Sequence, residues 1–229
     1  MKDKKNTWDK ENPPTCHTER IFWETENQEI PYLIHNTLYC ILRKMARIFL
    51  FRHGETTDNK DRIFSGTRDV DLTEKGVAEV EEIAEKLKDE KITKAYESEQ
   101  LRSRNTLKIV LRYHPDIIPI IDNRIRERDY GDLTGKNKDE TAKQYPNEYS
   151  LWHRSYDTPP PNGESIKDVE NRVVSFLDEV IPTLSTNDIV LISAHANSIR
   201  PMRKYFEGLS NEEMSTFEHE PAKIYSYKV

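Results

Sequence analysis

The chain has 229 residues, of which 33% are charged and 35% are hydrophobic, a composition typical of one substantial domain with a modest core and an appendage. No apolar run approaches the ~20 residues that a membrane-spanning helix needs. The formal net charge of -6 argues against nucleic-acid and anionic-membrane partners, because both require a broad basic surface, but it allows a small anionic substrate held by a few arginines.

Residues 1–44 differ in composition from the rest of the chain. They lack the positively charged start, apolar block and small-residue cleavage site of a secretory signal. Cys16 and Cys40, the only cysteines, both lie here, so the main body has no disulfide framework and a cytoplasmic location is the simplest interpretation. We expect an N-terminal extension over 1–44, disordered over 1–30, and a folded domain over 45–229.

From Met45, a candidate for the true initiator, strand and helix patterns alternate along the chain. Apolar residues at helical spacing, such as Val77, Val80 and Leu87, predict helices. The run Ser165-Ile166-Lys167-Asp168 resembles a capping box in which Asp replaces Glu or Gln. The alternation predicts a three-layer α/β/α sandwich with a mainly parallel central sheet. Strands are expected over 47–51, 92–96, 117–121, 188–194 and 224–227, helices over 73–90, 101–113, 165–180 and after Asn197, and one short helix or strand over 33–42.

The run Leu50-Phe51-Arg52-His53-Gly54-Glu55-Thr56 places an arginine and a histidine directly after the first expected strand. Ligands bind at the carboxyl ends of strands in open α/β sheets. An imidazole there is a candidate nucleophile, and the neighbouring guanidinium suits a phosphoryl group. An ordinary surface turn is the alternative, so the tripeptide needs support from elsewhere in the chain.

Two later strand-to-helix junctions carry residues of the same kind. Arg102 lies in the first turn of the helix that follows the second strand, and His195 follows the strand over 188–194. Taken alone, Arg102 could be a solvated helix residue and His195 a satisfied histidine at a strand end. Because parallel strands end at one edge of a sheet, we expect both residues to lie near Arg52 and His53.

The long segment over 123–164 is charged and rich in proline, a composition that rarely builds core. We expect this lid segment to fold over the site. Glu127 and Lys138 are its most chemically suggestive members, and the alternative for both is an ordinary surface loop with i,i+4 ion pairs.

These residues carry a family resemblance that covers 45–229 and nothing upstream. The chain resembles the histidine phosphatase superfamily and, within it, the cofactor-dependent (2,3-bisphosphoglycerate-primed) phosphoglycerate mutases. Asn137-Lys138 and Pro159-Pro160-Pro161 favour the mutases over plain phosphatases. The matching stretches are Arg52-His53-Gly54-Glu55 with Asn59, Phe64-Ser65-Gly66, Asp71-Leu72-Thr73-Glu74-Lys75-Gly76, Ser98 with Arg102 and Thr106, Glu127-Arg128-Asp129-Tyr130-Gly131, Leu133-Thr134-Gly135, Trp152-His153-Arg154 and Ala194-His195-Ala196-Asn197-Ser198.

The resemblance implies a phosphoglycerate mutase-like fold and a role for each matching residue. His53 would become a phosphohistidine, which requires a neutral imidazole whose pKa nearby guanidiniums hold down. Glu127 would act as general acid and base in a partly dry site. His195 would donate to the phosphoryl oxygens, with Arg52 and Arg102 beside it. The implied substrate-binding residues are Asn59, Ser65, Gly66, Arg128, Tyr130, Lys138, His153, Arg154, Ala196 and Asn197.

The same resemblance implies 2,3-bisphosphoglycerate as phosphoryl primer, and no metal, since the histidines show no ligand spacing. The resemblance also allows a homodimer, without deciding for or against one. Three functions compete. The first is interconversion of 3- and 2-phosphoglycerate in glycolysis and gluconeogenesis, the second is phosphomonoester hydrolysis, and the third is a non-catalytic phosphate-binding module. Retention of every candidate catalytic residue argues against the third.

Four departures from the mutase pattern bear on this choice. Ala196 stands where the family has glycine, which costs about 1 kcal/mol if the position needs a positive φ and nothing if it presents only an amide. His153 replaces the first of two paired arginines, so phosphate binding is expected to be weaker and pH-dependent. The segment over 155–164 is short, and the chain stops at Val229 without a covering tail. A more open site would admit water and favour hydrolysis.

Overall fold

The computed structural model describes residues 45–229, so the expectations for 1–30 and 33–42 lie outside the described residues. Within that part, five strands form one sheet in the order β3-β2-β4-β1-β5. All pairings are parallel except that of β5 with β1, which confirms a mainly parallel sheet. The strands are β1 (Arg47–Arg52), β2 (Lys94–Glu97), β3 (Ile120–Ile121), β4 (Ile189–Ala194) and β5 (Ile224–Lys228).

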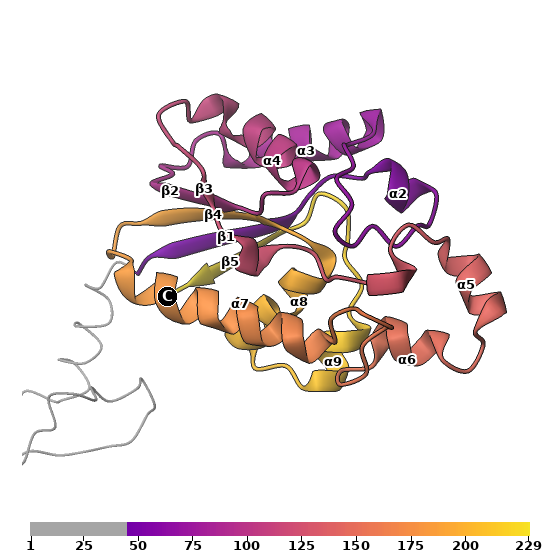
Figure 1. Ribbon diagram of the computed structural model, residues 1–229. Helices are drawn as coiled ribbons and strands as arrows, with labels where there is room; N and C mark the ends of the chain where they lie inside the picture. The colour runs from indigo at the N-terminus through magenta and orange to yellow at the C-terminus, as the bar shows by residue number, and fades with distance from the viewer. Residues whose placement is uncertain (1–44) are drawn as a thin grey trace, which may run out of the picture. The chain divides into compact units, whose positions relative to one another are not determined.

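Helices cover both faces of the sheet and complete the predicted three-layer sandwich. As Figure 1 shows, α3 (Glu74–Leu87) and α4 (Leu101–Val110) lie on one face, and α7 (Ile166–Val180) and α8 (Ala196–Glu207) lie on the other. Alternate side chains of β1 enter the two cores, so Phe51 packs with α3 and α4 while Leu50 packs with α7 and α8. None of the helices between residues 45 and 229 is both long and apolar enough to cross a bilayer.

The helix-start signals in the sequence are confirmed in the structure. Ser165 and Asp168 form a reciprocal capping box, in which the Asp168 amide donates to Ser165 Oγ at 3.1 Å and the Ser165 amide donates to Asp168 Oδ2 at 2.9 Å. The Thr73 hydroxyl likewise caps α3 through the Gly76 amide at 3.0 Å. Of the apolar stripe on α3, Val80 and Leu87 are buried but Val77, in the first turn, is exposed.

Strand boundaries differ most from expectation at the β3 edge of the sheet. Only Ile120–Ile121 pair with β2, although 117–121 carries the strand pattern, and both residues are about half exposed. The expected helix over 101–113 ends as an α-helix at Val110 and continues as a 3₁₀ turn. β3 is an edge strand that pairs with β2 alone, and short edge strands of this kind are common.

The lid segment (residues 123–164) forms two short helices, α5 (Lys138–Gln144) and α6 (Tyr149–Arg154), that the sequence pattern did not indicate. Contrary to expectation it also builds a small core, because Tyr130 and Leu133 are buried against Phe64. Two further short helices, α2 (Thr57–Lys60) and α9 (Asn211–Thr216), lack an apolar stripe long enough to predict them.

Candidate active site

The carboxyl ends of β1, β2 and β4 bring the candidate residues to one edge of the sheet. Arg52 pairs with Ala194 in the β1–β4 register, and the His53 amide donates to the Ala194 carbonyl at 3.1 Å. His195 follows directly, and its ring centroid lies 5.1 Å from that of His53. The predicted convergence of the two histidines is therefore confirmed.

His53 is held as a neutral imidazole with one free nitrogen. Its Nδ1 lies 2.7 Å from the Gly54 carbonyl oxygen; because a carbonyl only accepts, Nδ1 carries the proton and Nε2 keeps its lone pair. Burial lowers the pKa of His53 well below its ordinary value, and the guanidiniums of Arg52 and Arg102 lower it further. The sequence indicated the effect of the guanidiniums, but burial lowers the pKa of His53 more than they do.

His195 is fully buried beside Ser98. The Ser98 Oγ lies 2.7 Å from His195 Nε2 and accepts from the Gln100 amide at 3.4 Å. These contacts suit a tautomer in which Ser98 donates to Nε2 and the ring proton sits on Nδ1, an atom that is buried without a protein partner. Burial, followed by Arg102 and His53, lowers the pKa of His195. A neutral His195 of this tautomer still donates from Nδ1.

Arg102 is 1% exposed, so the alternative of a solvated helix residue is wrong. Its guanidinium donates to the carbonyls of Arg68 at 2.7 Å and Gly66 at 3.0 Å. The Gly66 carbonyl also accepts from the Gln100 side chain at 2.9 Å. Gly66 thus orients an arginine, with the buried Ser65 preceding it. Burial lowers the pKa of Arg102.

Glu127 is 7% exposed and is no ordinary surface-loop residue. Its Oε1 accepts from the Arg128 amide at 2.8 Å, and from the amide and side chain of Asn197 at 3.2 and 3.0 Å. Oε2 receives none of these bonds. The Glu127 backbone amide donates to Gln100 Oε1 at 2.8 Å, so both the main chain and the side chain are fixed.

Polar atoms of His53, Glu127 and His195 all lie within 4.8 Å of one another, a proximity that sequence spacing did not reveal. Such a group is also compatible with a cation, but two guanidiniums adjoin it and disfavour one. Four donor atoms nearby are buried without a protein partner, and these are Arg52 Nε, Arg102 Nε, Arg128 Nη2 and His195 Nδ1. This donor set fits an oxyanion such as a phosphoryl group.

A cavity of about 110 Å³ adjoins His53 on the side of the segment over 220–223. Arg52 and Asn59 line it as well. The Asn59 Oδ1 accepts from the Thr56 amide at 3.2 Å, which fixes the side chain at the cavity wall.

Two lid residues reach the site as half-buried groups. The Lys138 ammonium lies 5.5 Å from the Phe64 ring centroid, and burial, followed by Arg52, lowers the pKa of Lys138. The His153 ring meets Phe64 edge-on at 5.6 Å. Burial, followed by Arg154, lowers the pKa of His153 to about 3, so in the free protein His153 is neutral near pH 7 and the pH dependence expected of it moves to around pH 3.

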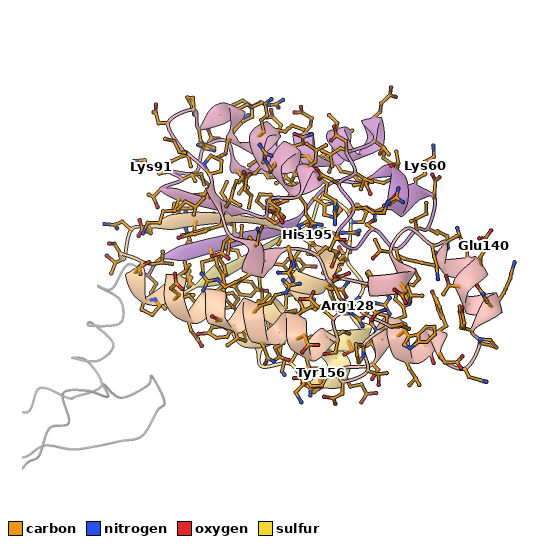
Figure 2. All side chains as sticks on the ribbon, viewed as in Figure 1. Lys60, Lys91, Arg128, Glu140, Tyr156 and His195 are labelled. Carbon is orange, nitrogen blue, oxygen red and sulfur yellow. The ribbon has the colours of Figure 1, made fainter. Side chains whose placement is uncertain are left out.

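The remaining lid candidates mainly hold the lid in place. Arg128 is fully buried, and it donates to the carbonyls of Glu164 at 2.6 Å and His153 at 3.4 Å. Arg154 forms an ion pair with Glu218. The Tyr130 hydroxyl accepts from Asn197 Nδ2 at 3.0 Å. In Figure 2, Arg128 and His195 lie toward the middle of the molecule.

Ala196 carries no strain, because it is the first residue of α8 and is absent from the non-glycine positive-φ residues found in 45–229. The alanine therefore presents an amide without conformational cost. Ser98 was matched to the family from the sequence but given no role at the site, and Gln100 and His219 were not named there at all. Ser98 belongs to a matching motif and could have been included, whereas His219, whose Nε2 lies 2.8 Å from the Ala196 carbonyl, belongs to none.

The family profile of the histidine phosphatase superfamily (branch 1) matches residues 48–229. The chain belongs to the histidine phosphatase superfamily. A 2,3-bisphosphoglycerate-dependent phosphoglycerate mutase of Nitrobacter winogradskyi is 40% identical in an alignment of 173 residues that covers 73% of this chain and 84% of the relative. Among solved structures of the superfamily fold, Bacillus stearothermophilus YhfR gives a TM-score of 0.73 at 26% identity, covering 80% of this chain and 91% of its own. The Shigella flexneri alpha-ribazole phosphatase gives 0.71 at 24% identity, covering 79% and 89%.

Proposed function

We propose that the chain is a 2,3-bisphosphoglycerate-dependent phosphoglycerate mutase, which interconverts 3- and 2-phosphoglycerate through a phosphohistidine on His53 in cytoplasmic glycolysis and gluconeogenesis. The observation that carries this proposal is the proximity of His53, Glu127 and His195 within 4.8 Å, beside two guanidiniums. The named mutase at 40% identity supports the choice of substrate.

In the proposed reaction, the phosphohistidine on His53 passes its phosphoryl group to the free hydroxyl of 3-phosphoglycerate, and Glu127, through Oε2, takes the proton of that hydroxyl. His53 Nε2 then attacks the other phosphorus of the bisphosphate so formed, the bond to that substrate oxygen breaks, and Glu127 returns the proton to it. His195 Nδ1 and the guanidiniums donate to the three phosphoryl oxygens in transit. Such a transfer depends on positioning and charge stabilisation, and needs no metal in this scheme.

The lid segment would hold the rest of the substrate, with residues 45–229 as the catalytic domain. Lys138, Arg154 and the free Nη2 of Arg128 are the cations available for a carboxylate and a second phosphate. The same groups suit 2,3-bisphosphoglycerate, which when bound supplies the phosphoryl group that primes His53.

A phosphomonoester phosphatase is the second candidate. The cavity beside His53 has charged walls, which include Arg52, Lys75 and Glu220, and a water molecule reaching a phosphohistidine releases inorganic phosphate. The neutral His153, in place of a family arginine, also weakens the hold on a second phosphate.

Phosphorus NMR on the purified chain separates these functions. The protein receives 3-phosphoglycerate with and without catalytic 2,3-bisphosphoglycerate, and 2-phosphoglycerate and free phosphate are followed together. We expect isomer formation that the bisphosphate stimulates. Phosphate release without isomer would establish the phosphatase instead, and no turnover would support the non-catalytic module. His53→Ala is the control for contaminating enzyme.

A further inference from the structure

His219 lies on the segment between α9 and β5 and is fixed on both sides. Its Nε2 lies 2.8 Å from the Ala196 carbonyl oxygen, so this nitrogen carries the ring proton and donates it. The Phe217 ring packs edge-on at 4.9 Å, and the Arg203 guanidinium covers Phe217 at 3.8 Å. The imidazole therefore has one orientation.

The hydrogen bond from His219 reaches Glu127 through a single peptide group. The carbonyl of Ala196 and the amide of Asn197 belong to the same planar unit. That amide donates to Glu127 Oε1 at 3.2 Å, beside the bond from the Asn197 side chain at 3.0 Å. A donor on the carbonyl fixes the plane of the peptide and polarises its N–H toward the carboxylate.

A proline in α8 removes a hydrogen bond next to this peptide. Pro201 lies inside the helix and has no N–H, so it cannot donate to the carbonyl of Asn197 four residues earlier. The first turn of α8 thus lacks one of its own hydrogen bonds. His219 supplies a donor to the neighbouring carbonyl from outside the helix.

The surroundings of His219 keep this donor in one state. Burial, followed by Arg52 from β1 and Arg200 from α8, lowers the pKa of His219 to about 3, and Arg203 of α8 adds to this. The fixed tautomer, with its proton on Nε2, then persists throughout the neutral pH range.

We propose that His219 is a positioning residue that, through the peptide between Ala196 and Asn197, holds the Glu127 carboxylate where it exchanges a proton with the substrate oxygen. This inference rests on the proposed function, since it assigns His219 to the acid–base half of that reaction. His219 takes no part in the attack of His53 on phosphorus.

The test compares two leaving groups. Protonation of the departing oxygen matters for the alkyl ester 3-phosphoglycerate but little for 4-nitrophenyl phosphate, whose phenolate leaves unaided. We expect His219→Ala to lower kcat with 3-phosphoglycerate about tenfold. The single-turnover burst of nitrophenolate, which reports phosphorylation of His53, should change less than twofold. Glu127→Gln is the reference, with the same selectivity and a larger loss.

Two further variants separate positioning from folding. Gln at position 219 extends an amide N–H about as far as imidazole Nε2, whereas Asn is too short. His219→Gln should recover most of the activity with 3-phosphoglycerate and His219→Asn should not, at similar melting temperatures. Equal losses with both substrates, or equal activity of the Gln and Asn variants, would overturn the proposal. If His219→Ala does not fold, the Gln–Asn comparison decides. Failure of wild type in the phosphorus NMR assay would refute the proposed function separately.

Discussion

The strand edge, by which we mean the edge of the sheet where β1 and β4 end, and the lid segment position their residues in different ways. His53 and His195 follow central strands whose side chains are almost wholly buried, and α3, α4, α7 and α8 pack against those strands (Figure 1). The lid segment has two helices of six and seven residues and one small core cluster. The two histidines thus lie on the rigid part of the domain, while Glu127 and most of the candidate substrate-binding groups lie on a part with few buried apolar contacts and lower local stability.

His53→Ala should have the largest effect at the strand edge. Without the imidazole no covalent intermediate forms, so we expect turnover of 3-phosphoglycerate to fall by at least about 10⁴-fold. Coupled-assay rates for wild type and variant measure this. A variant that keeps more than a hundredth of the wild-type rate would show that the nucleophile is elsewhere.

A pair of glycine substitutions tests whether the two regions differ in stability as described. An added Cβ at Gly54 would lie 2.3 Å from the Gly76 carbonyl oxygen, where the strand edge meets α3. At Gly131, which has a φ of +51°, it would lie 2.1 Å from the Pro161 carbonyl oxygen of the lid segment. We expect Gly54→Ala to lower the free energy of unfolding of the whole domain by about 2–3 kcal/mol, and Gly131→Ala to loosen mainly the lid segment.

Amide hydrogen exchange provides the readout for this pair. Gly54→Ala should speed exchange in β1 and β4 as well as in α3, and Gly131→Ala should speed it in α5 and α6 while β1 stays protected. Faster exchange throughout the domain in both variants would mean that the two regions unfold as one unit.

Lys138→Met tests the substrate-binding role proposed for the lid segment. The half-buried ammonium would be lost while much of the apolar contact with Phe64 is kept, so we expect KM for 3-phosphoglycerate to rise about tenfold with little change in kcat. Steady-state kinetics give both constants. A fall in kcat with an unchanged KM would move Lys138 from substrate binding to the chemical step.

The last prediction concerns stability in acid. The folded chain lowers the pKa values of His153 and His219 from 6.5 to about 3, so between pH 6.5 and 3 the unfolded chain binds more protons. The free energy of unfolding should therefore fall as the pH drops through that window, by up to about 1.4 kcal/mol per pH unit for each histidine. Urea unfolding at pH 7 and pH 5 measures the slope, which His153→Asn should reduce. An unchanged slope would mean that the pKa of His153 is the same in the folded and the unfolded chain.

The same contrast explains what the sequence could predict. Residues after β1 and β4 were predictable because apolar strands are visible in sequence and parallel strands end at one edge, which places His53 and His195 correctly. The capping box of α7 was equally local, since Ser165 and Asp168 carry it alone.

The features that the sequence did not reveal depend on contacts between distant segments. His219 carries no motif, and its importance comes from a hydrogen bond to a residue 23 positions away. The neutral state of His153 follows from burial under Phe64 and from Arg154, which spacing does not reveal. The short helix α6 lacks a full apolar stripe, so it folds by packing against Phe64 and Tyr130 rather than by its own pattern.

The most direct test of the account is to identify the atom that carries phosphate. The chain is treated with 2,3-bisphosphoglycerate, denatured in base and digested, and the phosphopeptide is analysed by phosphorus NMR and mass spectrometry. Because Nδ1 of His53 donates to the Gly54 carbonyl at 2.7 Å, we expect phosphate on Nε2 of His53. Phosphate on Nδ1, on another residue, or on none would contradict it.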